Sequence, residues 1–140
     1  MPPRQPLATL PTHAVYNMTP HIGDQDLWTG DTSLRHWVSQ MGGAWAADDL
    51  AALGAEAGAE ATFHLSEQAN RHGPELRVFD RYGMRLNAVE FHPAYHALMD
   101  IAVRHRTHNF SWFHDRPGAH VAHGAMTYMF SQAEGGVMCP

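Results

Sequence analysis

The chain has 140 residues, 44% of them hydrophobic, which is enough for one domain with a buried core. Its formal net charge is −5, and because nucleic-acid binding draws most of its affinity from cationic side chains, a nucleic-acid-binding domain is not expected. No run of 18 or more apolar residues exists, which argues against a membrane-spanning helix.

Residues 1–28 contain scattered prolines and no helical spacing of apolar side chains, so we expect an extended N-terminal arm. The segment lacks the continuous apolar core of a secretion signal, so it is not expected to be one. The side chains expected to anchor the arm are Tyr16, Ile22, Leu27 and Trp28.

A helix is predicted from Asp31, a good N-cap residue, to Met41, where the glycine pair 42–43 ends it. Helical spacing gives it one apolar stripe, which is expected to be buried. The members of this stripe are Leu34, Trp37, Val38 and Met41.

Two further helices follow in the predicted order. One starts near Ala46 and turns Leu50 and Leu53 inward, although the glycines at 54 and 58 each cost roughly 1 kcal/mol against alanine. The next runs from about 59 to 71, with Leu65 and Ala69 inward, and ends before Gly73-Pro74 because proline bars continuation.

The apolar period then changes to two, which predicts strands at 76–80 and 85–91. Gly83 suits the left-handed position of the loop between them. An isolated two-stranded hairpin is marginal in water, so we expect this one to pack on helices or on a partner. Its arginines are interpreted as a solvated face: Arg71, Arg77, Arg81 and Arg85.

His92-Pro93 opens a fourth helix with proline at its first position. Its expected buried stripe is Tyr95, Leu98, Met99, Ala102 and Val103. A solvated loop is expected over 106–118, followed by a fifth helix over about 119–135. The predicted inward residues of that last helix are Val121, Ala122, Ala125, Met126 and Met129.

Twelve histidines raise the possibility of a metal site. They include pairs three or four apart at 92/96, 105/108 and 120/123, but no HExxH pattern, and a zinc site needs a third protein ligand. Structural or surface roles are favoured, with His92 as an N-cap, and a metal-binding domain is the weaker alternative. Neither a GxSxG elbow nor a phosphate-binding glycine loop is present. The aromatic residues at helical spacing are predicted to lie in the core: Trp37, Phe63, Tyr95 and Tyr128.

The segment 131–140, SQAEGGVMCP, is ambiguous. Glu134 would lie near the negative pole of its own helix, and the residues alone favour an exposed acid in a fraying last turn. The glycine pair 135–136 either ends the helix or lets another group approach its backbone closely. Cys139 is the only cysteine, which excludes an internal disulfide framework and fits a reducing compartment.

Four pieces of the sequence resemble one known family: ANRHGPELRVFDRYG, VEFHPAYHALM, GAHVAHGAMTYMFSQAEGG and the terminal CP. With them, residues from about Thr12 to Pro140 look like the N-terminal helical domain of the AidB-type acyl-CoA dehydrogenases, which are linked to the response to DNA alkylation. The resemblance implies a mainly α domain with one small β-hairpin, belonging to residues 29–140. The chain ends where the helical domain of that family would continue, so we expect it to be truncated.

The resemblance also implies the properties of a complete protein. Such proteins are cytoplasmic, bind FAD and assemble as homotetramers, with a central β domain and a C-terminal helical domain besides this one. The flavin-binding residues, the catalytic carboxylate and any DNA-binding surface belong to those other domains. No catalytic, cofactor-binding or metal residue is therefore expected in residues 1–140.

One functional role can be carried over from the resemblance. The helix corresponding to 119–136 lies along the inner end of the acyl pocket in the wider superfamily, and a glutamate can close that end. Glu134, Gly135 and Met138 become candidates for the pocket wall. The first hypothesis is thus a non-catalytic domain that shapes an acyl pocket and supports oligomer assembly, and the alternative is a stand-alone helical interaction or regulatory module without flavin.

Overall fold

The computed structural model describes residues 11–14, 16 and 23–138. Most of the predicted N-terminal arm, and Cys139, lie outside the described residues. The elements run in chain order as α1 (Thr32–Gln40), η1 (Ala44–Ala46), α2 (Ala47–Ala57), α3 (Glu60–Arg71), β1 (Glu75–Phe79), β2 (Arg85–Glu90), α4 (Pro93–Arg104), η2 (Phe110–Phe113) and α5 (Ala119–Ala133). Within this part of the chain, every helix is too short or too polar to cross a bilayer.

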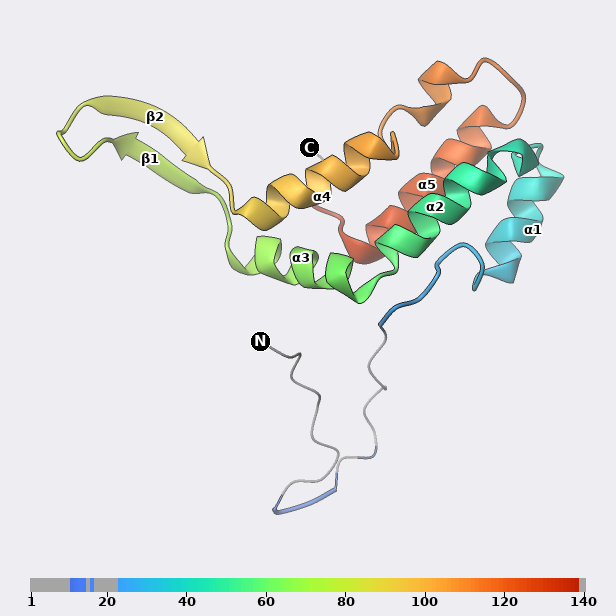
Figure 1. The fold of residues 1–140 in the computed structure, drawn as a ribbon, viewed down its shortest axis with the longest axis horizontal. Coiled ribbons are helices and arrows are strands. Elements are labelled where there is room, and N and C mark those ends of the chain that lie inside the picture. Colours follow the sequence, from blue (N-terminus) through green and yellow to red (C-terminus); the bar gives the residue numbers. More distant parts are fainter. Residues whose placement is uncertain (1–10, 15, 17–22, 139–140) are drawn as a thin grey trace.

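The core lies between two helix pairs. Figure 1 shows α2 lying along α5 and α3 lying along α4, with the hairpin projecting beyond the ends of α3 and α4. The largest fully buried apolar side chains come from α2, α4 and α5: Leu50, Leu53, Leu98, Met126, Met129 and Phe130. The prediction of a mainly helical domain with one small hairpin is confirmed, because apolar spacing of 3.6 residues places one stripe of each helix against its neighbours.

Helix α1 lies at the end of the bundle and buries a narrower stripe than predicted. Its start is confirmed, since Asp31 Oδ1 accepts a hydrogen bond of 2.8 Å from the backbone N–H of Leu34. Val38 is buried, but Trp37 and Met41 are 58% and 59% exposed, so the prediction of their burial is wrong. A helix at the edge of a bundle contacts the core along one line, and side chains beside that line face solvent.

The segment before α1 is held against α2 by backbone hydrogen bonds. Gln25 N–H donates to Gly58 O at 2.9 Å, and Leu27 N–H donates to Gly54 O at 3.1 Å. A Cβ atom at Gly58 would lie 1.9 Å from the Gln25 oxygen, so only glycine allows this approach. Gly54 and Gly58, which weaken the helical pattern of α2, thus form the contact surface for this segment. Leu27 and Trp28 are buried beside them.

The hairpin has the predicted turn but not the predicted packing. Gly83 adopts a φ of +83° in the loop, and β1 pairs antiparallel with β2. Both faces are open: Leu76 on one face is 67% exposed, and Phe79 on the other is 56% exposed. Of the two supports expected for the hairpin, helices or a partner, the described residues do not show the helices, and a partner remains a prediction.

Between α4 and α5 the predicted solvated loop is partly buried. Residues 106–118 contain η2, whose Phe110 is buried and stacks on Trp45 with ring centroids 5.8 Å apart. On α4 the burial of Val103 was wrongly expected, since it is 55% exposed while Ile101 faces the core. Tyr128 on α5 is likewise 51% exposed, so its predicted place in the core is wrong.

Candidate functional site

The carboxylate of Glu134 is buried at the C-terminal end of α5. Its residue is 6% exposed, which contradicts the interpretation as an exposed acid in a fraying turn. Oε1 accepts a hydrogen bond of 2.6 Å from the backbone N–H of Gly136. The last turn of α5 thus folds its own acid inward, where ionised acceptors need donors to offset lost hydration.

The other carboxylate oxygen is bonded to helix α3. Ser66 Oγ donates to Glu134 Oε2 at 2.7 Å, and Asn70 Nδ2 donates to the same oxygen at 2.8 Å. Asn70 Nδ2 also reaches the backbone oxygen of Ser66 at 2.9 Å, so the amide is held in place by its own helix. Residues 66 and 70 are four apart and share one helical face, which lets both donors meet a single acceptor.

A cavity of about 120 Å³ lies beside this carboxylate, between α3, the start of α4 and the segment after α5. Glu134 supplies its charged wall, while Phe91 and Tyr95 stack on each other with ring centroids 4.4 Å apart and form an aromatic side. The complete lining is Ala69, Asn70, His72, Pro74, Phe91, Tyr95, Glu134, Gly136 and Val137.

A second cavity, of about 190 Å³, lies on the other side of the chain end. Val137 lines both cavities, so residues 136–138 form the partition between them. Met138 lines this second cavity together with Met99 and Val103 of α4. Gly135 is exposed and lines neither cavity.

Two of the three residues proposed from the sequence therefore lie in cavity walls, Glu134 in the first and Met138 in the second. The residues that sequence reasoning missed are Ser66 and Asn70, which hold the glutamate. The sequence contained one indication of this contact: Ser66 and Asn70 are polar, four residues apart and close to the inward-facing residues predicted for α3. Their acceptor is 64 to 68 residues away in the chain, so only the fold reveals the contact.

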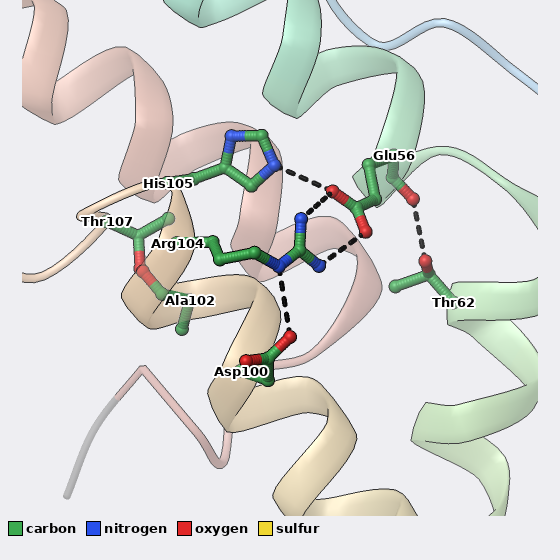
Figure 2. A network of polar contacts seen from close by, with 7 residues as sticks. All are labelled: Glu56, Thr62, Asp100, Ala102, Arg104, His105 and Thr107. Atoms are coloured by element: carbon green, nitrogen blue, oxygen red, sulfur yellow. Dashed lines mark hydrogen bonds and ion pairs between the residues drawn. The ribbon is translucent and has the colours of Figure 1, made fainter.

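A separate polar network joins α2 to the end of α4 (Figure 2). Arg104 donates to both oxygens of Glu56, at 3.0 and 2.8 Å, and His105 Nε2 lies 2.7 Å from Glu56 Oε2. The Arg104 hydrogen bonds, opposed by partial burial and helped by His105, lower the pKa of Glu56 from 4.5 to about 2. The network lines neither cavity beside Glu134 and acts as a clamp between the two helices.

Two histidines serve as a helix cap and as a hydrogen-bonding bridge. His92 Nδ1 accepts from the backbone N–H of Ala94 at 3.2 Å, as expected for an N-cap. His123 bridges Ser111 Oγ at 3.0 Å and the backbone oxygen of Thr107 at 2.9 Å. Among the residues that the structure describes, no three His, Cys, Asp or Glu side chains are grouped to hold a metal ion.

Comparison with protein families places this geometry in a known context. Residues 17–140 match the family described as the adaptive response protein AidB N-terminal domain. The chain belongs to this AidB N-terminal family. The resemblance seen in its sequence motifs is thereby confirmed.

Two known proteins are similar to this AidB-family chain. The putative acyl-CoA dehydrogenase AidB of Escherichia coli (strain K12) is 38% identical over 130 residues, covering 92% of this chain and 24% of that protein. A crystal structure of Caenorhabditis elegans ACDH-11 in complex with C11-CoA superposes with a TM-score of 0.72 at 21% identity, covering 91% of this chain and 23% of that one. The shared fold is that of the N-terminal domain of the acyl-CoA dehydrogenases, and the chain spans about a quarter of either relative's length.

Proposed function

We propose that this domain forms one wall of the acyl pocket in a larger FAD-dependent protein of the acyl-CoA dehydrogenase type, and that it is not catalytic by itself. The observation that carries the proposal is the buried Glu134 carboxylate, which lines a cavity with an aromatic side. The ACDH-11 crystal structure of similar fold is a complex with C11-CoA, and we propose a ligand of this class for the complete protein.

Such a wall would select acyl chains by their length. Phe91, Tyr95 and Val137 offer apolar surface to a hydrocarbon tail. A carboxylate that accepts hydrogen bonds from Ser66, Asn70 and Gly136 gains nothing from methylene groups and loses hydration against them, so in this proposal it limits how deep a tail can reach. In this proposal Glu134 is the stop and Met138 lines the neighbouring cavity, while Gly135 is an exposed residue of the turn between them.

The flavin belongs to the rest of the complete protein. The cavities beside Glu134 measure about 120 and 190 Å³, and neither is lined by an arginine. They do not fit a dinucleotide with its pyrophosphate, so FAD would be held by the central β domain and the C-terminal helical domain. When bound there, it would supply the oxidation of an acyl thioester at its α and β carbons, while the residues described here bind and orient the tail.

The proposal extends to cellular role and assembly. The family description names an adaptive response. From the resemblance of the sequence motifs we propose that the complete protein is cytoplasmic and acts in the response to DNA alkylation. With a net charge of −5, this chain is a poor DNA ligand, so any DNA contact would use the C-terminal domain. We further propose that the domain supports a homotetramer and that the arm, residues 1–28, packs on a neighbouring subunit; light scattering that finds the same tetramer after deletion of the arm would remove that role.

The pocket role is tested in the complete protein with a series of acyl-CoA ligands of increasing chain length. Glu134→Ala removes the stop and should shift the preference toward longer tails, while the matched control Ser131→Ala changes an exposed residue of the same turn. Binding is measured by calorimetry for each chain length. An unchanged order of preference in Glu134→Ala would count against the pocket role.

A further inference from the structure

We propose that Val137 is a specificity-determining residue: its side chain separates the cavity beside Glu134 from the second cavity and thereby sets how many carbons of an acyl tail the domain accepts. This inference rests on the acyl-pocket role proposed above and deepens it. Glu134 limits the depth of the first cavity by its charge, whereas Val137 closes the way into the second cavity by its size.

The two cavities are lined by one stripe of helix α4. Tyr95 lines the cavity beside Glu134, and Met99, one turn further along the helix, lines the second cavity. Ala102 and Val103 continue that lining by another turn. Residues three and four apart lie on one helical face, so this stripe follows both cavities over about 12 Å. The helix itself therefore does not divide them.

The segment after α5 supplies the division. Of the residues that the structure describes, Val137 alone lines both cavities. Its two neighbours differ, since Gly136 lines only the cavity beside Glu134 and Met138 lines only the second. The chain thus crosses from one cavity to the other at this position, where the Val137 side chain is 7% exposed and fills the space between them.

The backbone beside Val137 is held in place by Glu134. The Gly136 N–H donates to Glu134 Oε1 at 2.6 Å, and the same carboxylate accepts hydrogen bonds from Ser66 and Asn70 of α3. These bonds tie the start of the segment to two helices. The branched side chain adds stiffness, because two methyl groups on Cβ restrict rotation about χ1. The partition is therefore a fixed wall, which a longer tail does not displace.

The second cavity offers the surface that a hydrocarbon tail requires. Apart from Val137, its apolar lining consists of Met99, Ala102, Val103 and Met138. The remaining lining residues are Thr107 and the exposed His108. Thr107 is fully buried, and its hydroxyl already donates to the backbone oxygen of Ala102 at 3.3 Å. Because methionine side chains adapt to the shape that they contact, a tail that passed Val137 would bury further methylene groups here.

The size of the expected effect follows from the burial of methylene groups. Each methylene that moves from water to an apolar surface strengthens binding about fourfold. In the wild type this gain should stop at the tail length that fills the cavity beside Glu134, because the next carbons meet the carboxylate and Val137. Without the partition the gain should continue into the second cavity, which has a volume of about 190 Å³.

The first test measures by calorimetry how the complete protein binds acyl-CoA ligands that differ by single methylene groups. For the wild type, affinity should rise with tail length and then reach a plateau. Val137→Ala should move the plateau to tails about two carbons longer or more, with about a fourfold gain for each added carbon. Val137→Ile keeps the partition and should reach its plateau at the wild-type length or before. An unchanged plateau in Val137→Ala would overturn the proposal.

Two further variants separate this role from the general effect of shortening a buried side chain. Val38→Ala shortens a valine of α1 that is 3% exposed and lines neither cavity, so its plateau should stay at the wild-type length. Met138→Ala enlarges only the second cavity. It should leave the plateau unchanged by itself and extend it in the Val137→Ala background. An equal effect of Met138→Ala in both backgrounds would contradict a partition at Val137.

The second test is structural and does not depend on acyl binding. Xenon is a probe of apolar cavities, and crystals of the 140-residue chain can be pressurised with it. In the wild type, xenon should occupy the second cavity and stop at Val137. In Val137→Ala, a further xenon site should appear where the methyl groups were removed, joining the two cavities. A variant whose chain collapses into that space and leaves two separate cavities would overturn the partition.

Failure of this inference can be told apart from failure of the acyl-pocket role. A plateau that moves in Glu134→Ala but not in Val137→Ala would remove the role of Val137 and leave the acyl pocket standing. A wild type whose affinity does not depend on tail length would overturn both.

Discussion

Ser66 Oγ and Glu134 Oε2 lie 2.7 Å apart although 68 residues separate them in the chain. This hydrogen bond joins the middle of α3 to the end of α5, so the wall of the cavity and the helix behind it are held in one geometry. The stop proposed for the acyl pocket is therefore a carboxylate with a fixed position, and the predictions below test how that position and its helical frame are maintained.

Removing a donor from the buried carboxylate should destabilise the domain. Asn70→Ala leaves Glu134 Oε2 with Ser66 alone, and a partly unsatisfied buried acceptor costs about 1–3 kcal/mol. Urea unfolding of the chain measures the change. Ser33→Ala, at an exposed position of α1, is the control and should stay within about 0.5 kcal/mol of the wild type. Equal losses in the two variants would show that the Asn70 contact does not stabilise the site.

The clamp of Figure 2 should make stability depend on pH in the acid range. The pKa of Glu56 is lowered to about 2 in the fold, chiefly by Arg104, from its ordinary 4.5. A lowered pKa means that the unfolded chain takes up the proton first, so the stabilisation is complete above about pH 4.5 and is lost as the pH falls toward 2.

Glu56→Gln should remove this contribution to the pH dependence of stability between about pH 4.5 and pH 2. The free energy of unfolding, measured by urea at a series of pH values, should differ most from the wild type above pH 4.5, with the two curves converging toward pH 2. The amplitude is reduced by solvent screening, since the Glu56 side chain is 34% exposed. Glu67→Gln, in an exposed i, i+4 pair with Arg71, is the control. A constant difference between Glu56→Gln and wild type across the acid range would exclude this linkage.

Two glycines inside helices should respond to alanine with opposite signs. A Cβ at Gly54 would lie 2.6 Å from the backbone nitrogen of Trp28, so Gly54→Ala should cost about 1–3 kcal/mol through displacement of the docked segment. A Cβ at Gly124 of α5 would meet nothing within 4 Å, and Gly124→Ala should stabilise by about 0.4–1 kcal/mol. Thermal or urea unfolding compares the stability of the two variants. A higher stability in both would show that Gly54 is not needed for the contact between α2 and the segment before α1.

The cap of α4 gives a test of the histidine interpretation. His92→Ala removes the acceptor for the Ala94 N–H and should lower the free energy of unfolding by about 0.5–2 kcal/mol. The loss should be the same with and without zinc in the buffer. A zinc-dependent rise in melting temperature that disappears in His92→Ala would instead establish a metal site. His96→Ala, at an exposed position of the same helix, controls for the loss of an imidazole.

Local sequence patterns were sufficient to predict the type and order of the helices and strands. Helix stripes, N-caps and tight turns each depend on residues only a few positions apart. The caps at Asp31 and His92 and the turn at Gly83 are examples, so local patterns were enough to predict five helices and a hairpin. Family membership followed from the same motifs.

Tertiary structure alone decided which residues face the core and which partners they meet. Trp37 and Val103 lie on apolar stripes of their helices but are exposed, because burial depends on how far the neighbouring helix extends. Glu134 was expected at a fraying helix end, yet it is buried, because its donors come from α3, far away in the chain. A contact between distant residues leaves no periodic pattern in either segment, and for this reason the burial of Glu134 was not predicted from the sequence.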